Sequence, residues 1–339
     1  MNKRVTLRTI ADDLGITVAT ASLALRRHPR ISPETTQRVE QAAARLGYIY
    51  NRAAANLRQT RSNLVAVCVS DLSNPVFNEF LVYIEDELRE HQMQVFLGIA
   101  REDLAVQRHF LQTALEQGVG GIVLLPVRGT TRADLSALLP EGQIDPVVPT
   151  VVVSRALMDV ALPQFVNDDQ LAGRLAAQCL IDHGHKHIVW VGGGQQTSTA
   201  QNRLLGVQQA LSAAGLPQAE ILHGPTSRQF GHQSARALLT RDNPPSGVVC
   251  FSDLIAFGMI TGCQELGKLP GRDISIIGCD DMEEAHLTFP PLTTIAVDKA
   301  EIGRRASRRL LAPLTGQDIV VLPPKLVLRE TVGPPAPDR

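Results

Sequence analysis

Three histidines in the second half of the chain have the spacing of metal ligands. His183, His185 and His187 alternate in HGHKH, as ligands on a strand can, but no carboxylate-rich partner motif accompanies them. A helix that ends near Gly184, followed directly by the start of a strand, explains the same residues. We therefore expect no metal and no cofactor here.

Two further motifs carry residue types used in catalysis. The glycines at 192–194 are not followed by the Lys-Ser/Thr of a phosphate-binding loop, and the GxGxxG spacing is absent. The acidic pairs Asp280-Asp281 and Glu283-Glu284 lack a nucleophile or base in their neighbourhood. These patterns predict a protein that is not an enzyme.

Residues 6–25, TLRTIADDLGITVATASLAL, combine two short helical patterns that meet at a glycine. Thr6 caps a first helix with apolar residues at i, i+3, i+4 and i+7, Gly15 relaxes the turn, and Thr17 caps a second helix. The short side chains of that second helix allow a close approach to base edges in a major groove. This pattern predicts a helix-turn-helix, which reads duplex DNA, although an ordinary helical hairpin remains an alternative.

The N-terminal segment is also basic. Residues 1–61 contain eleven Lys and Arg against four Asp and Glu, a net of +7. The chain totals of 33 basic and 34 acidic residues leave 22 against 30 in the remainder, a net of −8. A basic unit on an acidic body predicts phosphate binding by the first part only, with an affinity that falls as salt rises. A solvated charged face is the alternative that charge alone leaves open.

A third helix and a linker complete the N-terminal region. Ser32, followed by a proline, predicts the start of that helix and Gly47 predicts its end, which gives a headpiece over residues 1–50. Residues 51–61 (NRAAANLRQTR) are too short and polar to bury themselves, so we expect a hinge that becomes helical only against DNA and a second copy. Leu57 is suited to wedge into a minor-groove base step, and a plain linker leucine is the alternative.

From residue 64 onward, apolar runs of strand length alternate with amphipathic helical segments. This alternation predicts an α/β body of parallel sheets covered by helices on both faces. Because the remaining length exceeds the needs of one sheet, we expect two doubly wound lobes with a ligand between them at the carboxyl ends of the strands. The runs are LVAVCVS (64–70), QVFLGIA (94–100), GIVLLP (121–126), TVVVS (150–154), HIVWVGG (187–193), GVVCF (247–251) and DISIIGC (273–279).

Composition narrows the class of protein further. The chain has 339 residues, of which 44% are hydrophobic, enough for two or three domains with a large core. The sequence has no apolar run of about 18 residues and no secretory signal at its start, so we expect a cytoplasmic protein without membrane contact. The five cysteines occur singly and are expected to be reduced. An aromatic content of 4% argues against a stacking surface for single-stranded nucleic acid.

Taken together, these residues resemble the lactose-repressor/galactose-repressor (LacI/GalR) family of bacterial transcription regulators. The resemblance implies a dimeric, non-enzymatic regulator whose body folds like the periplasmic sugar-binding proteins. A weaker resemblance to the maltose-regulon branch, through Leu23 and Ser154-Arg155, does not identify an effector. The resemblance spans nearly the whole chain, through TLRTIADDLGITVATASLAL, RISPETTQRVEQAAARLGYIYNRAAANLR, LVAVCVSDLSNPVF, GVGGIVLLP, NDDQLAGRLAAQCLIDHGHKHIVWVGG, RLLGVQQAL, FSDLIAFG, DISIIGCDD and PPLTTI.

Carried over position by position, the resemblance implies a set of DNA-binding residues. Val18, Ala19 and Leu23 would face bases, and Leu57, one turn after Ala54, would enter the central minor groove. Many members have an arginine that reads guanine where this chain has Leu23, which cannot donate a hydrogen bond. Readout there would rely on apolar contact or on DNA shape. The other candidates, which would hold phosphates or packing contacts, are Thr6, Thr17, Thr20, Ser22, Arg30, Ser32, Thr35, Tyr48 and Asn51.

The resemblance also implies an effector site between the two lobes. Two arginines and an aspartate there would clamp hydroxyls or a phosphate through charge-assisted hydrogen bonds. Serines at 154 and 252 replace polar residues of the family pattern, so we expect poorly compensated positive charge. This favours a sugar or sugar phosphate, with an anionic metabolite second. The candidate effector-binding residues are Asn74, Phe77, Ser154, Arg155, Arg203, Ser252, Asp253 and Asp280.

These expectations give one mechanism and one alternative. Two headpieces of a homodimer bind a pseudo-palindromic operator, and an effector changes the angle between the lobes and hence hinge order, with a coupling of about 1 to 3 kcal/mol. The alternative is a cytoplasmic solute-binding or sugar-modifying protein whose headpiece is only an oligomerisation hairpin.

The Pro-rich tail lacks heptads, which favours a dimer over a tetramer. The expected boundaries are 1–50 headpiece, 51–61 hinge, 62–330 body (lobe 1 near 62–163 and 293–319, lobe 2 near 164–292 and 320–330) and 331–339 tail.

Overall fold

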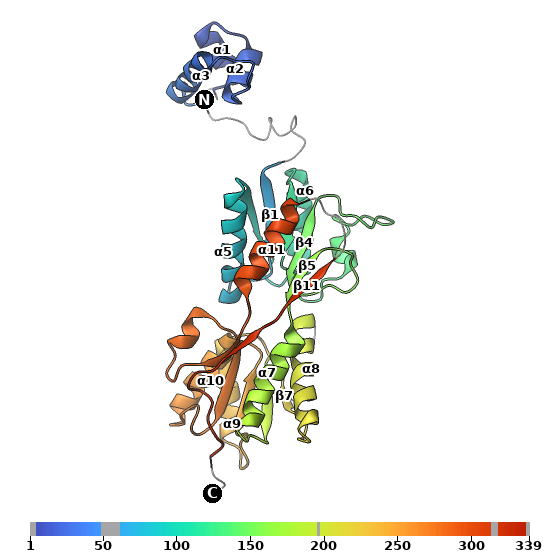
Figure 1. The fold of residues 1–339 in the computed structure, drawn as a ribbon, viewed down its shortest axis with the longest axis vertical. Coiled ribbons are helices and arrows are strands. Elements are labelled where there is room, and N and C mark those ends of the chain that lie inside the picture. Colours follow the sequence, from blue (N-terminus) through green and yellow to red (C-terminus); the bar gives the residue numbers. More distant parts are fainter. Residues whose placement is uncertain (1–4, 49–61, 195–196, 313–317, 337–339) are drawn as a thin grey trace. The chain divides into compact units, whose positions relative to one another are not determined.

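The computed structural model describes residues 5–48, 62–194, 197–312 and 318–336. Backbone contacts divide the chain into two compact units, residues 1–61 and residues 62–339 (Figure 1). The whole of the expected hinge, residues 51–61 with Asn51, Ala54 and Leu57, lies outside the described residues. Within the described ranges, no helix combines the length and the apolar character needed to cross a bilayer.

The described part of the first unit, residues 5–48, contains three helices, α1 (Leu7–Leu14), α2 (Val18–Leu25) and α3 (Pro33–Leu46). The side chains of Thr6, Thr17 and Ser32 each accept a hydrogen bond from the backbone N–H three residues on, as N-caps do. Gly15 ends α1 with φ +66°, a left-handed conformation that costs glycine little. The three predicted helices are confirmed. They enclose a small core of Ile10, Ala11, Ala21, Ala24, Val39, Ala42 and Ala43.

In the second unit, the residues that the structure describes form two six-stranded sheets, which define two lobes. Lobe 1 has the strand order β11-β5-β4-β3-β1-β2, and lobe 2 has the order β12-β10-β9-β8-β6-β7. The paired strands are parallel except β12, which runs antiparallel to β10. The strands of lobe 1 are β1 (Leu64–Val69), β2 (Gln94–Ile99), β3 (Gly121–Leu124), β4 (Thr150–Ser154), β5 (Gln164–Asn167) and β11 (Ile319–Leu322). Those of lobe 2 are β6 (Ile188–Val191), β7 (Glu220–Leu222), β8 (Gly247–Cys250), β9 (Ser275–Asp280), β10 (Thr293–Ala296) and β12 (Lys325–Val327).

Helices cover both sheets, so the predicted α/β class is confirmed, and all seven apolar runs contain a strand. In lobe 1, α11 lies beside α5 although the two are far apart in sequence (Figure 1). In lobe 2, α7 packs on α8 and α9 packs on α10. The helices of the body are α5 (Pro75–Glu90), α6 (Leu104–Glu116), α7 (Asp169–Asp182), α8 (Ser198–Ala213), α9 (Arg228–Leu239), α10 (Asp253–Glu265) and α11 (Lys299–Leu311), with short 3-10 turns η1 (Arg132–Leu135) and η2 (Glu283–His286).

The chain passes between the lobes three times, after β5, after β10 and after β11. These crossings differ by a few residues from the expected boundaries. β5 pairs with β4 and so belongs to lobe 1, and β10 pairs with β9 and so belongs to lobe 2. β11 pairs with β5 in lobe 1. A short strand can join either sheet, and its membership is decided by hydrogen-bonded pairing that the local sequence does not reveal.

Candidate functional site

A cleft lies between the lobes, at the carboxyl ends of the strands of both sheets. Its empty space, including the open mouth, is about 810 Å³. Its place agrees with the expectation for doubly wound sheets. Its polar and aromatic lining consists of Asp71, Asn74, Phe77, Phe80, Glu102, Arg128, Ser154, Arg155, Asn167, Asp169, Thr197, Thr199, Arg203, Thr226, Phe251 and Asp280.

The lobe 1 wall centres on Arg155, which follows β4. Its guanidinium donates to both carboxylate oxygens of Glu102, at 2.7 and 3.1 Å, and to the carbonyl of Pro126 at 2.8 Å. The same guanidinium lies over the ring of Phe77, 5.4 Å from its centroid. Arg128 adds a longer ion pair to Glu102 at 3.7 Å. This wall therefore presents an aromatic ring beside a guanidinium that is already paired with a carboxylate.

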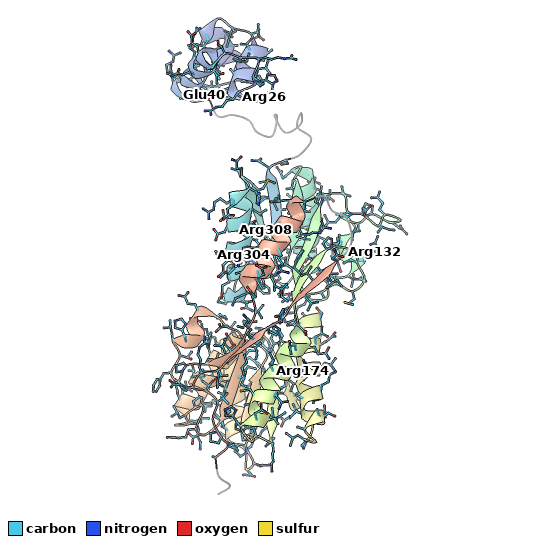
Figure 2. The ribbon with its side chains drawn as sticks, viewed as in Figure 1. Arg26, Glu40, Arg132, Arg174, Arg304 and Arg308 are labelled. Carbon is cyan, nitrogen blue, oxygen red and sulfur yellow. The ribbon has the colours of Figure 1, made fainter. Side chains whose placement is uncertain are left out.

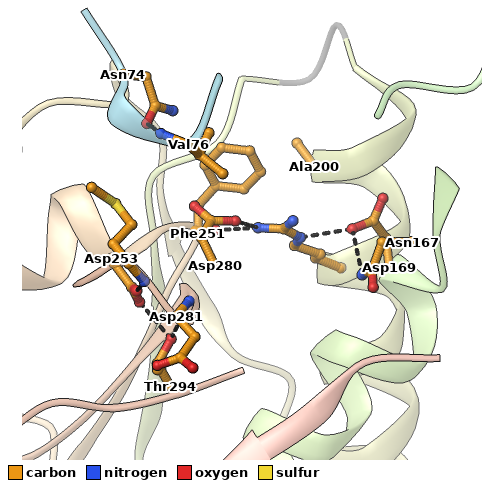
Figure 3. A network of polar contacts seen from close by, with 12 residues as sticks. Asn74, Val76, Asn167, Asp169, Ala200, Phe251, Asp253, Asp280, Asp281 and Thr294 are labelled. Carbon is orange, nitrogen blue, oxygen red and sulfur yellow. Dashed lines mark hydrogen bonds and ion pairs between the residues drawn. The ribbon is translucent and has the colours of Figure 1, made fainter. Parts of the chain in front are cut away.

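The lobe 2 wall repeats this arrangement around Arg203 of α8. Arg203 Nε donates to Asp169 at 2.8 Å, and its terminal nitrogen donates to the Phe251 carbonyl at 2.8 Å and to Asp280 at 3.4 Å (Figure 3). The guanidinium also lies 5.2 Å from the centroid of the Phe251 ring. Burial raises the pKa of Asp280 to about 6, and the positive charge of Arg203 opposes that rise.

Packing between α7 and α8 places Arg203 in the cleft wall. An added Cβ at Gly173 of α7 would come within 1.8 Å of the Arg203 carbonyl oxygen. The reverse holds on α8, where a Cβ at Gly206 would lie 2.0 Å from the Gln170 carbonyl oxygen. Only residues without a side chain allow this close backbone approach.

The structure brings six of the eight expected effector residues to the cleft, namely Asn74, Phe77, Ser154, Arg155, Arg203 and Asp280. Ser252 and Asp253 are fully buried and do not line it. The carboxylate of Asp253 instead accepts hydrogen bonds from the Met282 N–H at 2.8 Å and the Thr294 hydroxyl at 2.5 Å (Figure 3). Burial, followed by repulsion from Asp280, raises the pKa of Asp253 to about 7. Asp253 supports the loop that follows β9 from behind the cleft wall.

Three important residues of the cleft were not singled out from the sequence. Glu102 and Asp169 carry the carboxylates that pair with Arg155 and Arg203, and Phe251 provides the second ring. The expectation of poorly compensated positive charge is therefore wrong, because acids from distant segments fold back onto both arginines. Asp169 lies within the NDDQ motif and could have been found there, whereas nothing in the sequence around Glu102 marks it.

Amide groups supply polar contacts that do not carry charge. Asn74 caps α5 by accepting from the Val76 N–H at 3.3 Å through its side-chain oxygen, which leaves its NH₂ group unused by that cap. The side-chain oxygen of Asn167 is buried and accepts no hydrogen bond among the described residues. Buried polar atoms without partners cost free energy, so a ligand hydroxyl that donates to Asn167 would remove that cost.

Several of the expected DNA-binding residues of the first unit lie on α2. Val18 (44% exposed) and Ala19 are exposed, whereas Thr20, Ser22 and Leu23 are half-buried. Thr17 accepts from the Thr20 N–H at 3.1 Å. The remaining expected DNA-binding residues lie outside α2. Of these, Thr6, Arg30 and Ser32 are exposed, and Thr35 and Tyr48 are half-buried.

Arginines flank the end of α2. The guanidinium of Arg26 donates to the Ser22 carbonyl at 3.1 Å and to its hydroxyl at 3.3 Å, and Arg27 pairs with Glu40 at 3.0 Å. Figure 2 labels Arg26 and Glu40 on this unit. This unit thus combines an exposed, small-residue helix face with adjacent positive charge, as a helix that approaches phosphates requires.

The three alternating histidines have structural partners. His183 is the C-cap of α7 and its ring contacts the Cys179 carbonyl at 2.7 Å, and Gly184 follows with φ +94°. His185 lies between the Ser246 hydroxyl, at 2.9 Å, and the Gly333 carbonyl, at 2.8 Å. The predicted helix end is confirmed. In the described part of the chain, no group of three or more His, Cys, Asp or Glu is placed to hold a metal ion.

A helix-turn-helix unit joined to a two-lobed body with a small-molecule cleft defines a ligand-responsive DNA-binding regulator. Comparison with known proteins agrees with this class. Residues 6–51 match the family of bacterial regulatory proteins, lacI family, and residues 177–332 match a periplasmic binding protein-like domain.

Whole-chain relatives are also regulators. The chain is 30% identical over 317 residues to the HTH-type transcriptional repressor CytR of Escherichia coli (strain K12), covering 93% of this chain and 91% of that protein. It is 29% identical over 333 residues to the ribose operon repressor of Haemophilus influenzae (strain ATCC 51907 / DSM 11121 / KW20 / Rd), covering 96% and 98%. A lac repressor dimer bound to operator and the anti-inducer ONPF superposes with a TM-score of 0.86 at 25% identity, covering 98% of this chain and 100% of that one. The chain belongs to the lacI family of bacterial regulatory proteins and is a DNA-binding transcriptional regulator.

Proposed function

We propose that this regulator is a repressor whose affinity for its operator is set by a neutral, polyhydroxylated small molecule bound in the cleft. The observation that carries the proposal is the pairing of two of the three cleft arginines, Arg155 with Glu102 and Arg203 with Asp169 and Asp280. The third, Arg128, lies 3.7 Å from the carboxylate of the same Glu102. Paired guanidinium and carboxylate groups still present hydrogen-bond donors and acceptors to hydroxyls. A phosphate, by contrast, would have to compete with those carboxylates for the same cations.

Two of the aromatic rings that line the cleft support a flat, ring-shaped ligand. Phe77 and Phe251 come from opposite lobes, and each is stacked near an arginine. Apolar ring faces flanked by a few polar groups are typical of small-molecule sites. A LacI family regulator from Enterococcus faecium, 28% identical and covering 80% of this chain and 99% of its own, was solved with bound ribose, and its TM-score is 0.72. That relative makes a pentose the first ligand to test.

A direct test compares D-ribose and cellobiose with ribose 5-phosphate by thermal unfolding of the full chain. A ligand at about 100 times its Kd stabilises the folded state by about 2.7 kcal/mol, which raises the Tm of a body of this size by several degrees. Stabilisation by a neutral sugar, with no response to the phosphorylated one, supports the proposal. The reverse order would contradict it.

A charge-removal variant makes this test sharper. Glu102→Gln frees the guanidinium of Arg155 without a change in shape, so its cleft carries one more uncompensated positive charge. We expect this variant to gain affinity for ribose 5-phosphate relative to the parent. Glu220→Gln is the matched control, because Glu220 forms a similar bidentate pair with Arg241 on the exposed surface.

We further propose that the protein acts as a homodimer in the cytoplasm, on a pseudo-palindromic operator, and that it releases its ligand unchanged. The operator-bound lac repressor dimer supports the first part, since a twofold dimer presents two reading helices to two half-sites. In this scheme residues 1–50 read DNA through the expected set around α2, residues 51–61 form the hinge, and residues 62–330 sense the effector. Recovery of the ligand without chemical change after prolonged incubation with the protein, checked by NMR, tests the non-enzymatic part.

A further inference from the structure

Lys299 is a buried cation outside the effector cleft. It is the first residue of α11, is 6% exposed, and is not among the residues that line the cleft. Its ammonium group contacts three oxygens: the Glu79 carboxylate at 3.0 Å, the Asp281 carbonyl at 3.2 Å, and the Asp280 carbonyl. An ammonium has three donors, so these contacts satisfy it fully. Burial of a lysine is costly unless it is paired in this way.

The three oxygens come from different lobes. Glu79 lies on α5 of lobe 1, the helix that also supplies Phe77 to the cleft and is capped by Asn74. Asp280 and Asp281 lie at the end of β9 in lobe 2. Lys299 itself belongs to α11, which packs against α5 and the lobe 1 sheet. One side chain thus joins a lobe 1 helix to a lobe 2 loop.

The lobe 2 loop has a backbone conformation that requires support. Asp280 has φ +122° and Asp281 has φ +47°, both in the region that favours glycine. This unusual pair of residues turns two successive carbonyl oxygens toward the Lys299 ammonium. It also directs the Asp280 carboxylate toward Arg203 in the cleft wall.

We propose that Lys299 is a positioning residue that ties Asp280, a cleft carboxylate of lobe 2, to α5 of lobe 1, so that the lobe–lobe angle and the geometry of the effector site change together. This regulatory role rests on the proposed function of the cleft. The physical tie itself does not require a ligand, because every contact of Lys299 is within the protein.

The test is hydrogen exchange by mass spectrometry on the full chain, without ligand or DNA. Lys299→Met removes the charge and keeps most of the side-chain volume. Loss of the tie should speed exchange by about tenfold or more in two places at once, residues 76–84 of α5 and residues 278–285 of lobe 2. Glu79→Gln, at a partly exposed position, should speed exchange in the same two segments. This variant replaces Lys299→Met in the test if Lys299→Met does not fold.

Arg329→Gln is the matched control. Arg329 pairs with the Asp281 carboxylate at 2.7 Å and donates to the Leu292 carbonyl at 2.8 Å, so it holds the same loop entirely from within lobe 2. Its loss should speed exchange in 278–285 and leave 76–84 unchanged. The proposal is overturned if Lys299→Met affects only one segment or neither, or if Arg329→Gln loosens α5 to the same degree. Since no effector is present, a failed sugar screen would leave this result intact, and a failed tie would leave the sugar proposal intact.

Discussion

Replacement of Asp253 by Asn should change how the stability of lobe 2 depends on pH. Asp253 is fully buried at the start of α10 and accepts hydrogen bonds from the Met282 N–H and the Thr294 hydroxyl. An asparagine has nearly the same shape. It can accept from Met282 through its oxygen and donate to the Thr294 oxygen through its amide, so both contacts survive without a charge.

The sign and size of the effect follow from the pKa of Asp253. Burial raises that pKa from 3.8 to about 7. The unfolded chain therefore loses the proton first as pH rises, and the free energy of unfolding falls between about pH 4 and pH 7. A shift of about three units at about 1.4 kcal/mol per unit gives about 4 kcal/mol across that window. The asparagine of the variant would not titrate, so the stability advantage of Asp253→Asn should grow by about that amount from pH 4 to pH 8.

Urea unfolding followed by the single tryptophan measures this difference at fixed protomer concentration. Trp190 is buried in β6 of the same lobe and contacts Phe251 edge-on. The control is Asp273→Asn, since the Leu269 N–H and then Arg272 lower the pKa of Asp273. The ionised Asp273 therefore stabilises the folded state at neutral pH, and this stabilisation is lost on acidification. The stability difference between Asp273→Asn and the parent protein should thus change with pH in the opposite direction. If the stability difference between Asp253→Asn and the parent protein is the same at pH 4 and pH 8, the reasoning fails.

Three other substitutions test the cleft, the hinge and the helix packing. Arg203→Ala should abolish the effect of the effector on operator binding while headpiece DNA binding persists, and an unchanged response in a fluorescence-anisotropy titration would remove Arg203 from the site. Leu57→Ala should weaken specific operator binding more than non-specific binding, so equal losses in both would argue against a minor-groove wedge. Gly173→Ala should destabilise the body by about 1 to 3 kcal/mol through overpacking against α8. Ala172→Gly, at the neighbouring position on α7, is the control because it adds no atom that could clash with α8. An unaltered unfolding midpoint for Gly173→Ala would show that the two helices can separate without cost.

Local sequence was sufficient to predict the first unit. The capping residues Thr6, Thr17 and Ser32 and the glycines at 15 and 47 define three helices by rules that act within a few residues. The same holds for the seven apolar runs of the body, because a fully buried parallel strand needs a continuous apolar segment. The strands β5, β7, β10, β11 and β12 were missed, since they are three or four residues long and most mix polar with apolar residues.

The candidate cleft was predictable only in part. Asn74, Arg155, Arg203 and Asp280 stand in motifs that resemble the family pattern, and the structure brings them together. Asp253 belongs to such a motif as well, yet the fold turns its carboxylate away from the cleft and toward Thr294.

The sequence by itself determined the class of this protein: a basic helix-turn-helix segment, an alternating α/β body, and cleft residues in recognisable order. Tertiary structure alone decided the charge balance of the cleft, through Glu102 and Asp169, and the tie that Lys299 makes between the lobes. The physical reason is the distance along the chain over which each kind of interaction acts. Helix caps and strand hydrophobicity are fixed by neighbours along the chain, whereas the electrostatic partner of a buried charge is whichever group the fold brings within a few ångströms.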